Sequence, residues 1–157
     1  MKVSRIAGVG CLSIVLAVAG CDRDRARSDG AGKSPAAASN LALLLDVPAT
    51  VRAGEEVPVA VTLVNRGAAP ASVPGVQPEV VVTRADGGEV WRRTRHEHAT
   101  RETGDIALRP NEMRGSGSSW DQRDDAGRPV APGGYRIRAE AVALGLVSDV
   151  RTVTIQP

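Results

Sequence analysis

The chain has 157 residues, a length that suits one folded domain and a short targeting segment. Residues 41–157 carry 14 arginines, no lysine and 15 acidic residues, so this part of the chain is nearly neutral. The only aromatic residues are two tryptophans and one tyrosine. Proteins that bind nucleic acid usually combine a basic excess with stacking aromatic side chains, so no nucleic acid is expected as a partner.

Residues 1–20 predict a bacterial lipoprotein signal peptide. A basic start precedes an uncharged apolar stretch, Ile6 to Ala19, which is too short to span a membrane as a helix. The sequence then reads Leu-Ala-Val-Ala-Gly before Cys21, which resembles a lipobox. A signal peptidase cuts before such a cysteine, and the thiol takes up diacylglycerol. We expect a lipidated Cys21 with acyl chains such as palmitate; an ordinary secretory signal with a chance cysteine is the alternative.

Lipidation of Cys21 implies a protein anchored in the bacterial cell envelope, on the periplasmic side of the inner or outer membrane or on the outer face of a single membrane. Cys11 lies inside the signal peptide, so the mature chain has one cysteine and no internal disulfide. Residues 21–40 add mixed charges, small residues and a proline to the lipidated cysteine, which predicts a disordered tether. The folded domain is expected over residues 41–157.

Short segments with alternating apolar residues follow along this domain. In Val57 to Leu63 every second residue is apolar, and Pro58 predicts that this strand lies at a sheet edge or begins after the proline. Asp-Gly-Gly at residues 86–88 predicts a hairpin turn. Residues 135–141 form the clearest two-sided strand, apolar on one face and charged on the other. Strands are expected at residues 41–47, 57–63, 80–83, 90–92, 106–108, 113–120, 135–141 and 150–155.

These segments predict an all-β protein, an antiparallel immunoglobulin-like β-sandwich of seven to eight strands. No segment of helical length repeats its apolar residues with a period of 3.6. Alternation, in place of continuous apolar runs, argues against a parallel α/β sheet. Trp91 and Trp120 are expected in the core, because few other large side chains are available to fill it.

Three pieces of the domain carry a resemblance to a known family. The first runs from Gly54 through alternating valines to Gly67, and the second is Asp-Gly-Gly-Glu-Val-Trp-Arg at residues 86–92. The third joins Trp120 to Gly-Arg-Pro-Val-Ala-Pro-Gly-Gly-Tyr-Arg-Ile at residues 127–137. In this order and spacing they resemble the BsuPI-type intracellular proteinase inhibitor domain, an immunoglobulin-like sandwich, over residues 41–157.

The resemblance implies a protease as partner and inhibition as function. The chain departs from the family in having no phenylalanine and in its turn at residues 108–112, where Leu-Arg-Pro-Asn-Glu replaces a Leu-x-Pro-Gly-Glu-like sequence. The family's namesake works inside the cell, whereas this chain is expected to be exported. Fold therefore transfers more directly than function.

Two segments are the expected protease-docking loops, residues 64–78 and residues 92–105. Within the second, the candidate partner contacts are His96, Glu97, His98 and Arg101. His96 and His98 stand two residues apart, so on an extended segment both imidazoles face one way and share a metal, with Glu102 or Asp105 completing the shell. Two histidines fall short of the usual three or four ligands, and no metal or other cofactor is predicted.

Other motifs indicate no enzyme. Asp121, Asp124 and Asp125 lack the oxygen spacing of an EF-hand loop, and the serines near residues 115–119 do not form a nucleophile elbow. Three functions remain from these observations. The first is protease inhibition at the envelope, by loop or strand-edge docking. The second is a module that binds an envelope protein or glycan. The third is a metal-binding or metal-dependent protein acting through His96 and His98.

Overall fold

The computed structural model describes residues 40–97 and 101–157, and for residues 76 and 101–103 it describes the backbone alone. The predicted signal peptide, the lipidated Cys21 and most of the tether lie outside the described residues. Within the described part, no helix is long and apolar enough to cross a membrane.

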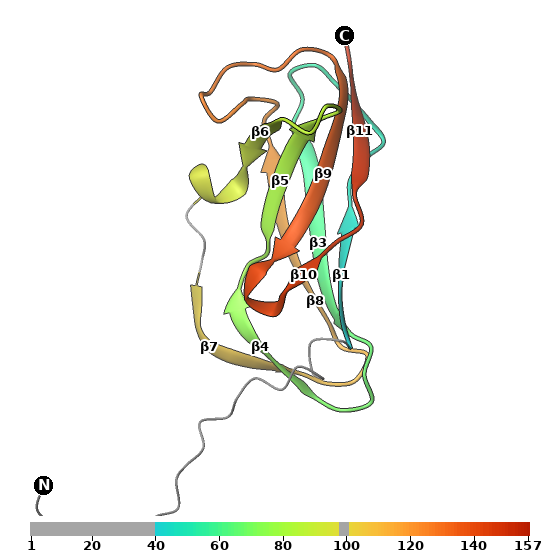
Figure 1. The fold of residues 1–157 in the computed structure, drawn as a ribbon, viewed down its shortest axis with the longest axis vertical. Coiled ribbons are helices and arrows are strands. Elements are labelled where there is room, and N and C mark those ends of the chain that lie inside the picture. The colour runs from blue at the N-terminus through green and yellow to red at the C-terminus, as the bar shows by residue number, and fades with distance from the viewer. Residues whose placement is uncertain (1–39, 98–100) are drawn as a thin grey trace, which may run out of the picture. The chain divides into compact units, whose positions relative to one another are not determined.

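The described residues form an all-β domain with two short 3-10 turns (Figure 1). The fold class predicted from the sequence is confirmed, but the strand number is eleven, not seven or eight. The strands are β1 (Leu41–Asp46), β2 (Thr50–Arg52), β3 (Val57–Asn65), β4 (Ala71–Val76), β5 (Glu79–Arg84), β6 (Glu89–Arg92), β7 (Arg101–Leu108), β8 (Met113–Trp120), β9 (Gly133–Ala141), β10 (Leu146–Val147) and β11 (Arg151–Gln156); the turns are η1 (Arg93–Arg95) and η2 (Val142–Leu144).

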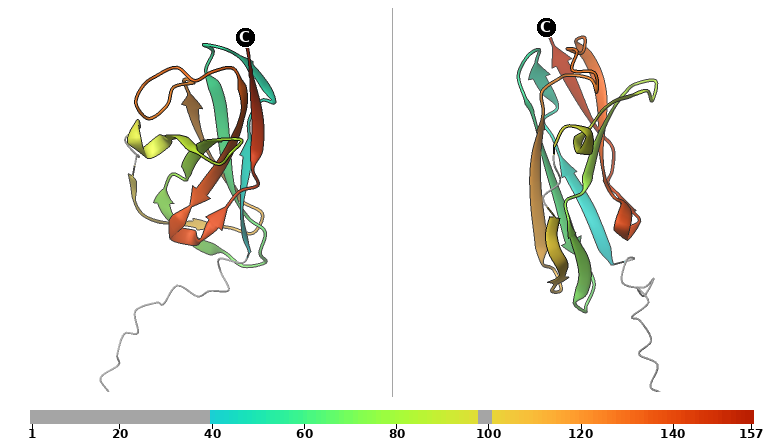
Figure 2. Two further views of the ribbon diagram at one scale, coloured as in Figure 1. Left: turned by 45° about the horizontal axis from the view of Figure 1, so that its top comes forward. Right: turned by 90° about the vertical axis from the view of Figure 1, so that its left-hand side faces the viewer.

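Two sheets face each other, and a two-stranded ribbon joins them at one end. The smaller sheet has the order β1-β3-β8, and the larger has the order β2-β11-β9-β5-β6 with β10 beside β9. The right-hand view of Figure 2 shows the two layers edge-on. All pairings are antiparallel except the one between β2 and β11. This arrangement is an immunoglobulin-like sandwich.

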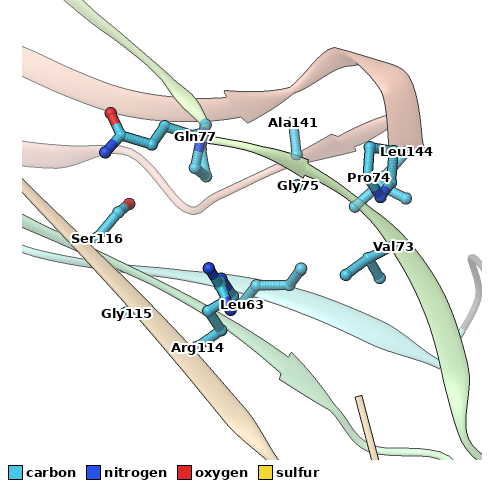
Figure 3. Close-up of a pocket in the computed structure, with 11 residues that line it drawn as sticks. Leu63, Val73, Pro74, Gly75, Gln77, Arg114, Gly115, Ser116, Ala141 and Leu144 are labelled. Atoms are coloured by element: carbon cyan, nitrogen blue, oxygen red, sulfur yellow. The ribbon is translucent and has the colours of Figure 1, made fainter. Parts of the chain in front are cut away.

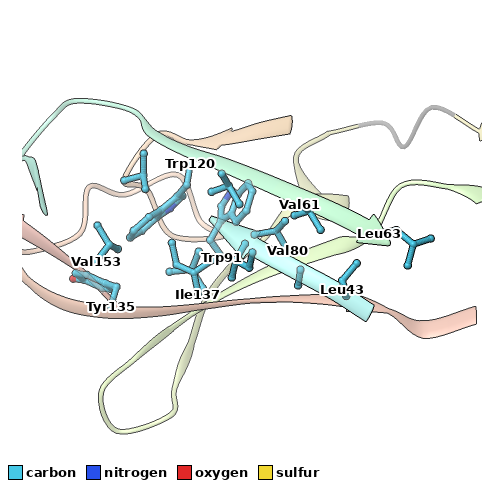
Figure 4. Packing of buried hydrophobic residues seen from close by; sticks show 14 of the residues in the cluster. Leu43, Val61, Leu63, Val80, Trp91, Trp120, Tyr135, Ile137 and Val153 are labelled. Atoms are coloured by element: carbon cyan, nitrogen blue, oxygen red, sulfur yellow. The ribbon is translucent and has the colours of Figure 1, made fainter. Parts of the chain in front are cut away.

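Alternation in the sequence builds the core between the layers (Figure 4). Val57, Val59 and Val61 are buried in β3, whereas the residues between them are exposed. Tyr135 and Ile137 point inward from β9, as the two-sided pattern predicts. The core comprises Leu41, Leu43, Leu45, Val57, Val59, Val61, Leu63, Ala71, Val73, Val80, Val82, Val90, Trp91, Leu108, Trp120, Tyr135, Ile137, Ala139, Val153 and Ile155.

The aromatic residues lie in the core, and the polar atoms of Trp120 and Tyr135 are hydrogen-bonded. Trp91 is 3% exposed and Trp120 is 0% exposed, which confirms that both fill the core. Trp120 packs edge-to-face on Tyr135, with ring centroids 5.2 Å apart. The indole Nε1 of Trp120 donates to the carbonyl of Arg123 at 2.8 Å, and the Tyr135 hydroxyl donates to the carbonyl of Ala131 at 2.8 Å. These bonds fix the loop between β8 and β9.

The expectation for Pro58 is wrong. The proline lies within β3, which is the central strand of the smaller sheet. The pairing of β1 with β3 ends at Asp46 opposite Ala60, so β1 does not reach Pro58. A missing N–H therefore costs no ladder hydrogen bond on that side.

Gln122 closes the end of the sandwich at the turn between β2 and β3. Its side chain is 4% exposed, and its backbone has a φ of 57°. The amide Nε2 donates to the carbonyls of Arg52 and Glu55, both at 2.7 Å, and Oε1 accepts from the N–H of Gly54 at 2.9 Å. One side chain thus satisfies three backbone groups of the turn between β2 and β3.

Candidate functional site

The two segments nominated as docking loops lie side by side. β4 pairs with β7 in an antiparallel ribbon, with Ala71 opposite Leu108 and Val73 opposite Ile106. The register shifts between Pro74 and Val76. We call these two strands the β4–β7 ribbon. Residues 64–78 and 92–105, separate alternatives in the sequence, therefore belong to one surface.

The β4–β7 ribbon has a buried face and an exposed face. Ala71, Val73 and Leu108 are at most 5% exposed and anchor the ribbon in the core. Ser72 and Asp105 lie on the exposed face, where the Ser72 hydroxyl donates to Oδ2 of Asp105 at 3.1 Å. The buried face thus anchors the ribbon on the core, and the exposed face presents polar side chains and backbone to solvent.

Asn65 sets the position of the ribbon. Its side chain is fully buried, and Nδ2 donates to the carbonyls of Ala69 at 2.9 Å and Leu108 at 3.0 Å. Oδ1 accepts from the N–H of Gly67 at 2.9 Å. A Cβ on Gly67 would lie 2.9 Å from Cβ of Asn40, so only glycine fits this turn without a shift. The loop before β4 and the end of β7 are therefore tied to β3.

Arg93 fastens η1 to the junction between β4 and β5. It is 2% exposed, although arginine is almost never fully buried unless paired. Its guanidinium donates to Oε1 of Gln77 at 2.8 Å, to the carbonyl of Gln77 at 3.3 Å and to the carbonyl of Pro78 at 2.9 Å. The carboxylate of Glu97 lies 3.6 Å away and balances the charge. Removing this side chain would leave three partly buried acceptors without this donor.

Asp125 links the β8–β9 loop to the segment after β6. Its Oδ1 accepts from the N–H of Arg92 at 3.1 Å and contacts Nε2 of His96 at 3.0 Å, while Oδ2 pairs with Arg95. The His96 ring stacks on Trp91, with centroids 5.8 Å apart and an interplanar angle of 13°. His96 therefore packs against the domain and belongs to an ion-pair cluster.

A second ion-pair group flanks this cluster on β6. Arg92 contacts Glu89 at 2.8 Å, Glu140 at 3.5 Å and Glu79 at 3.8 Å. The hydrogen bond from Arg92 lowers the pKa of Glu89 below its ordinary value, and the same bond raises the pKa of Arg92. Both side chains are partly exposed, so these ion pairs contribute little to the free energy of unfolding.

The remaining predicted residues are placed only in part. Glu97 pairs with Arg93, as described above. His98 lies outside the described residues, and for Arg101 the backbone alone is described, paired opposite Val76. Among the residues that the structure describes, no three His, Cys, Asp or Glu side chains are grouped to hold a metal ion.

The acidic turn at residues 121–125 has local partners. Asp124 accepts hydrogen bonds from the side chain and N–H of Arg128, which lower the pKa of its carboxyl, and from the N–H of Ala126. Asp121 accepts from the N–H of Arg123 at 3.1 Å. The interpretation of this segment as a polar turn fits these contacts.

A small cavity opens between the layers beside the ribbon (Figure 3). Its volume is about 180 Å³, below the roughly 300 Å³ at which small-molecule pockets begin. Leu63, Val73 and Leu144 form its apolar walls, and Gln77 and Ser116 its polar ones. Its size suits a single side chain of a partner better than a substrate molecule.

Sequence reasoning missed Arg93 and underrated Asp125. A buried arginine gives no pattern in the sequence, because its acceptors are backbone carbonyls of a distant segment. The contacts of His96 are the Asp125 carboxylate and the indole ring of Trp91. The β4–β7 ribbon, η1 and Asp125 are held together by these contacts, and we call them the ribbon–η1 surface.

The family comparison matches the part of the chain that builds this surface. The BsuPI family, described as intracellular proteinase inhibitor, matches residues 46–145. The chain belongs to this family. The match includes β4, β7, η1 and Asp125, and it confirms the resemblance seen in the sequence. The family is described as one of proteinase inhibitors, which is consistent with a protein that is not an enzyme.

Three solved structures are similar to the chain at low sequence identity. A Pseudomonas fluorescens alkylpurine DNA glycosylase bound to DNA with an abasic-site analogue is 15% identical, with a TM-score of 0.48 over 75% of this chain and 31% of that chain. A CARDB domain from Pyrococcus furiosus in complex with di-metal ions is 18% identical, with a TM-score of 0.42 over 74% and 87%. A Listeria innocua β-glucosidase in complex with glucose is 16% identical, with a TM-score of 0.47 over 74% and 16%. The chain thus spans less than a third of the glycosylase and about a sixth of the glucosidase. No curated protein matches the chain by sequence.

The turn at residues 108–112 has asparagine where the Leu-x-Pro-Gly-Glu-like sequence has glycine. Asn111 stands where the family-like turn has glycine, and its φ is 62°. Asparagine adopts this left-handed region more readily than other residues with a side chain. The N–H of Asn111 donates to the carbonyl of Asn65 at 2.7 Å, so the turn from β7 into β8 is retained.

Proposed function

We propose that this protein is a lipid-anchored, non-catalytic inhibitor of a serine protease at the bacterial cell envelope, and that it docks on the protease through the ribbon–η1 surface. The observation that carries the proposal is the family match over the residues that build this surface. Inhibitors of this kind present main chain to a protease cleft in extended form, and β4 and β7 supply extended backbone.

Rigidity of the surface supports docking. Association costs free energy for every loop that must be ordered, so a surface ordered beforehand binds more tightly. Asn65 and Arg93, both buried, hold the two ends of the surface by hydrogen bonds to backbone carbonyls. Asp125 holds η1 by contacts to His96 and Arg95.

The lipid anchor is supported by the sequence alone. Cys21 follows a lipobox-like segment, and the 19 residues that separate it from β1 leave room for a tether. Replacement of Cys21 by serine is expected to release the protein from the membrane fraction, because the thiol is the acceptor of the lipid. Retention of Cys21→Ser in that fraction at the level of the unchanged chain would contradict the anchor and leave the inhibitor proposal standing.

Two matched substitutions test the docking surface. Ala107 is exposed on the ribbon, and Thr152 is exposed on β11 in the larger sheet. Both lie in strands with side chains toward solvent, so an arginine is tolerated at either position. We expect Ala107→Arg to weaken inhibition of the target protease and Thr152→Arg to leave it unchanged. Equal inhibition by the two variants would place the contact elsewhere on the domain, and capture of an envelope protein without inhibition would favour a binding module.

A further inference from the structure

β8 is an open edge of the smaller sheet. It pairs with β3 on one side, and no strand within residues 40–97 and 101–157 pairs with the other side. The right-hand view of Figure 2 shows β8 at the outer border of its layer. The strand is eight residues long, from Met113 to Trp120, and no charged residue follows Arg114 within it.

The pairing of β8 with β3 shows which backbone groups of β8 point toward the open edge. The N–H of Asn65 donates to the carbonyl of Glu112 at 3.1 Å, so residues 112, 114, 116 and 118 direct their backbone groups toward β3. Gly115, Gly117 and Ser119 therefore direct theirs toward the open edge. Neither glycine has a heavy atom within 4 Å of an added Cβ, so the sheet is unobstructed on that face.

Three other edge strands in the described residues, β1, β6 and β4, carry features that hinder pairing. On β1 the carbonyl of Leu45 accepts from Nε of Arg151 at 3.2 Å. On β6 the register shifts between Val82 and Thr83 of the neighbouring strand, and ion pairs surround the strand end. β4 carries Pro74. Charges, prolines and bulges are the usual means by which proteins protect sheet edges, and β8 has none of them over residues 115–120.

One polar atom beside this edge has no partner. The hydroxyl of Ser118 is buried without a hydrogen bond, and among the described side chains no other buried polar atom is in this state. Ser116 lies two residues away on the same, inward face of β8. Buried hydroxyls without a partner are rare and costly, so an added strand that brings a donor or acceptor to Ser118 would be favourable.

We propose that a second copy of this chain adds to the open edge, with the two β8 strands antiparallel about a twofold axis at Gly117. In this register Gly115 pairs with Ser119 of the other copy. Ser116 stands opposite Ser118 of the other copy in the pair that makes no backbone hydrogen bonds, where side chains approach most closely. A change of rotamer turns the Ser118 hydroxyl toward its new partner.

The chemistry of the edge favours a second copy over another partner. A twofold axis brings identical residues together, and like charges facing each other would repel. The uncharged run of residues 115–120 avoids this repulsion, and glycine at the axis lets the two backbones approach. Pairing of the edges joins the two three-stranded sheets into one continuous sheet.

Cysteine cross-linking in the full chain tests the register. In a backbone-bonded antiparallel pair the Cα atoms are about 5.5 Å apart, which lies within the range that a disulfide spans. Gly117→Cys is therefore expected to give a covalent dimer on mild oxidation. Gly115→Cys is the control on the same strand and face. Its two copies would lie four residues apart along the strands, about 14 Å, and should remain uncross-linked.

The outcome is read on non-reducing gels, with far-UV circular dichroism confirming that each variant is folded. Both variants carry the same native cysteines, so cross-links through those appear equally in both. Dimer from Gly117→Cys alone supports the proposal. No dimer from folded Gly117→Cys, or equal dimer from both variants, would overturn it. Sedimentation of the unchanged chain provides the independent measurement: two copies per particle are expected, and one copy at every concentration would also overturn the proposal.

Discussion

Arg93 is the residue on which the ribbon–η1 surface depends most, and its replacement by alanine gives the sharpest stability prediction. The side chain is 2% exposed and donates to three oxygen atoms of Gln77 and Pro78. Each hydrogen bond to a charged group contributes about 1.5–3 kcal/mol, and the bonds to one guanidinium are not additive. Water entering the vacated space would restore part of the loss. We expect Arg93→Ala to lower the free energy of unfolding by about 3 kcal/mol, a large share of the 5–15 kcal/mol typical of a domain.

Two further variants separate the causes of that loss. Arg93→Lys keeps the charge but lacks the planar fork, so it should recover only part of the stability. Arg95→Ala removes a neighbouring arginine whose side chain is 52% exposed, and its cost should stay below about 1 kcal/mol. Urea unfolding of the three variants and the unchanged mature chain measures these differences from midpoints and slopes. A loss for Arg93→Ala no larger than that for Arg95→Ala would refute the claim that Arg93 is a buried tie.

Three other predictions concern single residues outside the ribbon. Gln122→Ala leaves two carbonyls and one N–H without their partner, and thermal unfolding should show a loss of about 3 kcal/mol; a loss under about 1 kcal/mol would mean that water replaces the side chain. Asn111→Gly should be nearly neutral in urea unfolding, whereas Asn111→Ala should cost about 1 kcal/mol, because φ is positive there; equal costs would contradict the turn geometry. The pKa of Glu89 is lowered by Arg92, so its contribution is present above the ordinary value of 4.5 and is lost as pH falls through the lower folded value. Glu89→Gln should therefore be less stable than the unchanged chain at pH 7, by no more than about 1 kcal/mol, and the gap should close in melting curves toward pH 3; a gap independent of pH would contradict the ion pair.

The strands of the sandwich were predictable wherever one face of a strand is buried and the other faces solvent. β3 alternates over its whole length and β9 from Gly133 to Glu140, because each inward residue meets the opposite layer. The hairpin of β5 and β6 follows from Asp-Gly-Gly, with Gly87 at a φ of 90°. These signals are local, so a single sequence carries them.

The ribbon was predictable only in part, because β4 and β7 are strands by virtue of pairing with each other, and they lie far apart in the sequence. β4 contains Pro74 and Gly75, which read as loop residues, and the first half of β7 is charged and lacks alternation. Their pairing with each other overrides both local signals. The burial of Arg93 depends in the same way on carbonyls contributed by Gln77 and Pro78, so no spacing in the sequence reveals it.

Titration of a serine protease with the mature chain tests inhibition most directly. Residual protease activity is measured against increasing amounts of the chain, for a panel of proteases that includes those of the envelope. The account predicts that at least one protease loses activity in a saturable way at one chain per enzyme, and that the chain stays uncut. Undiminished activity across the panel, or cleavage of the chain as a substrate, would contradict inhibition and leave the family membership as a likeness of fold alone.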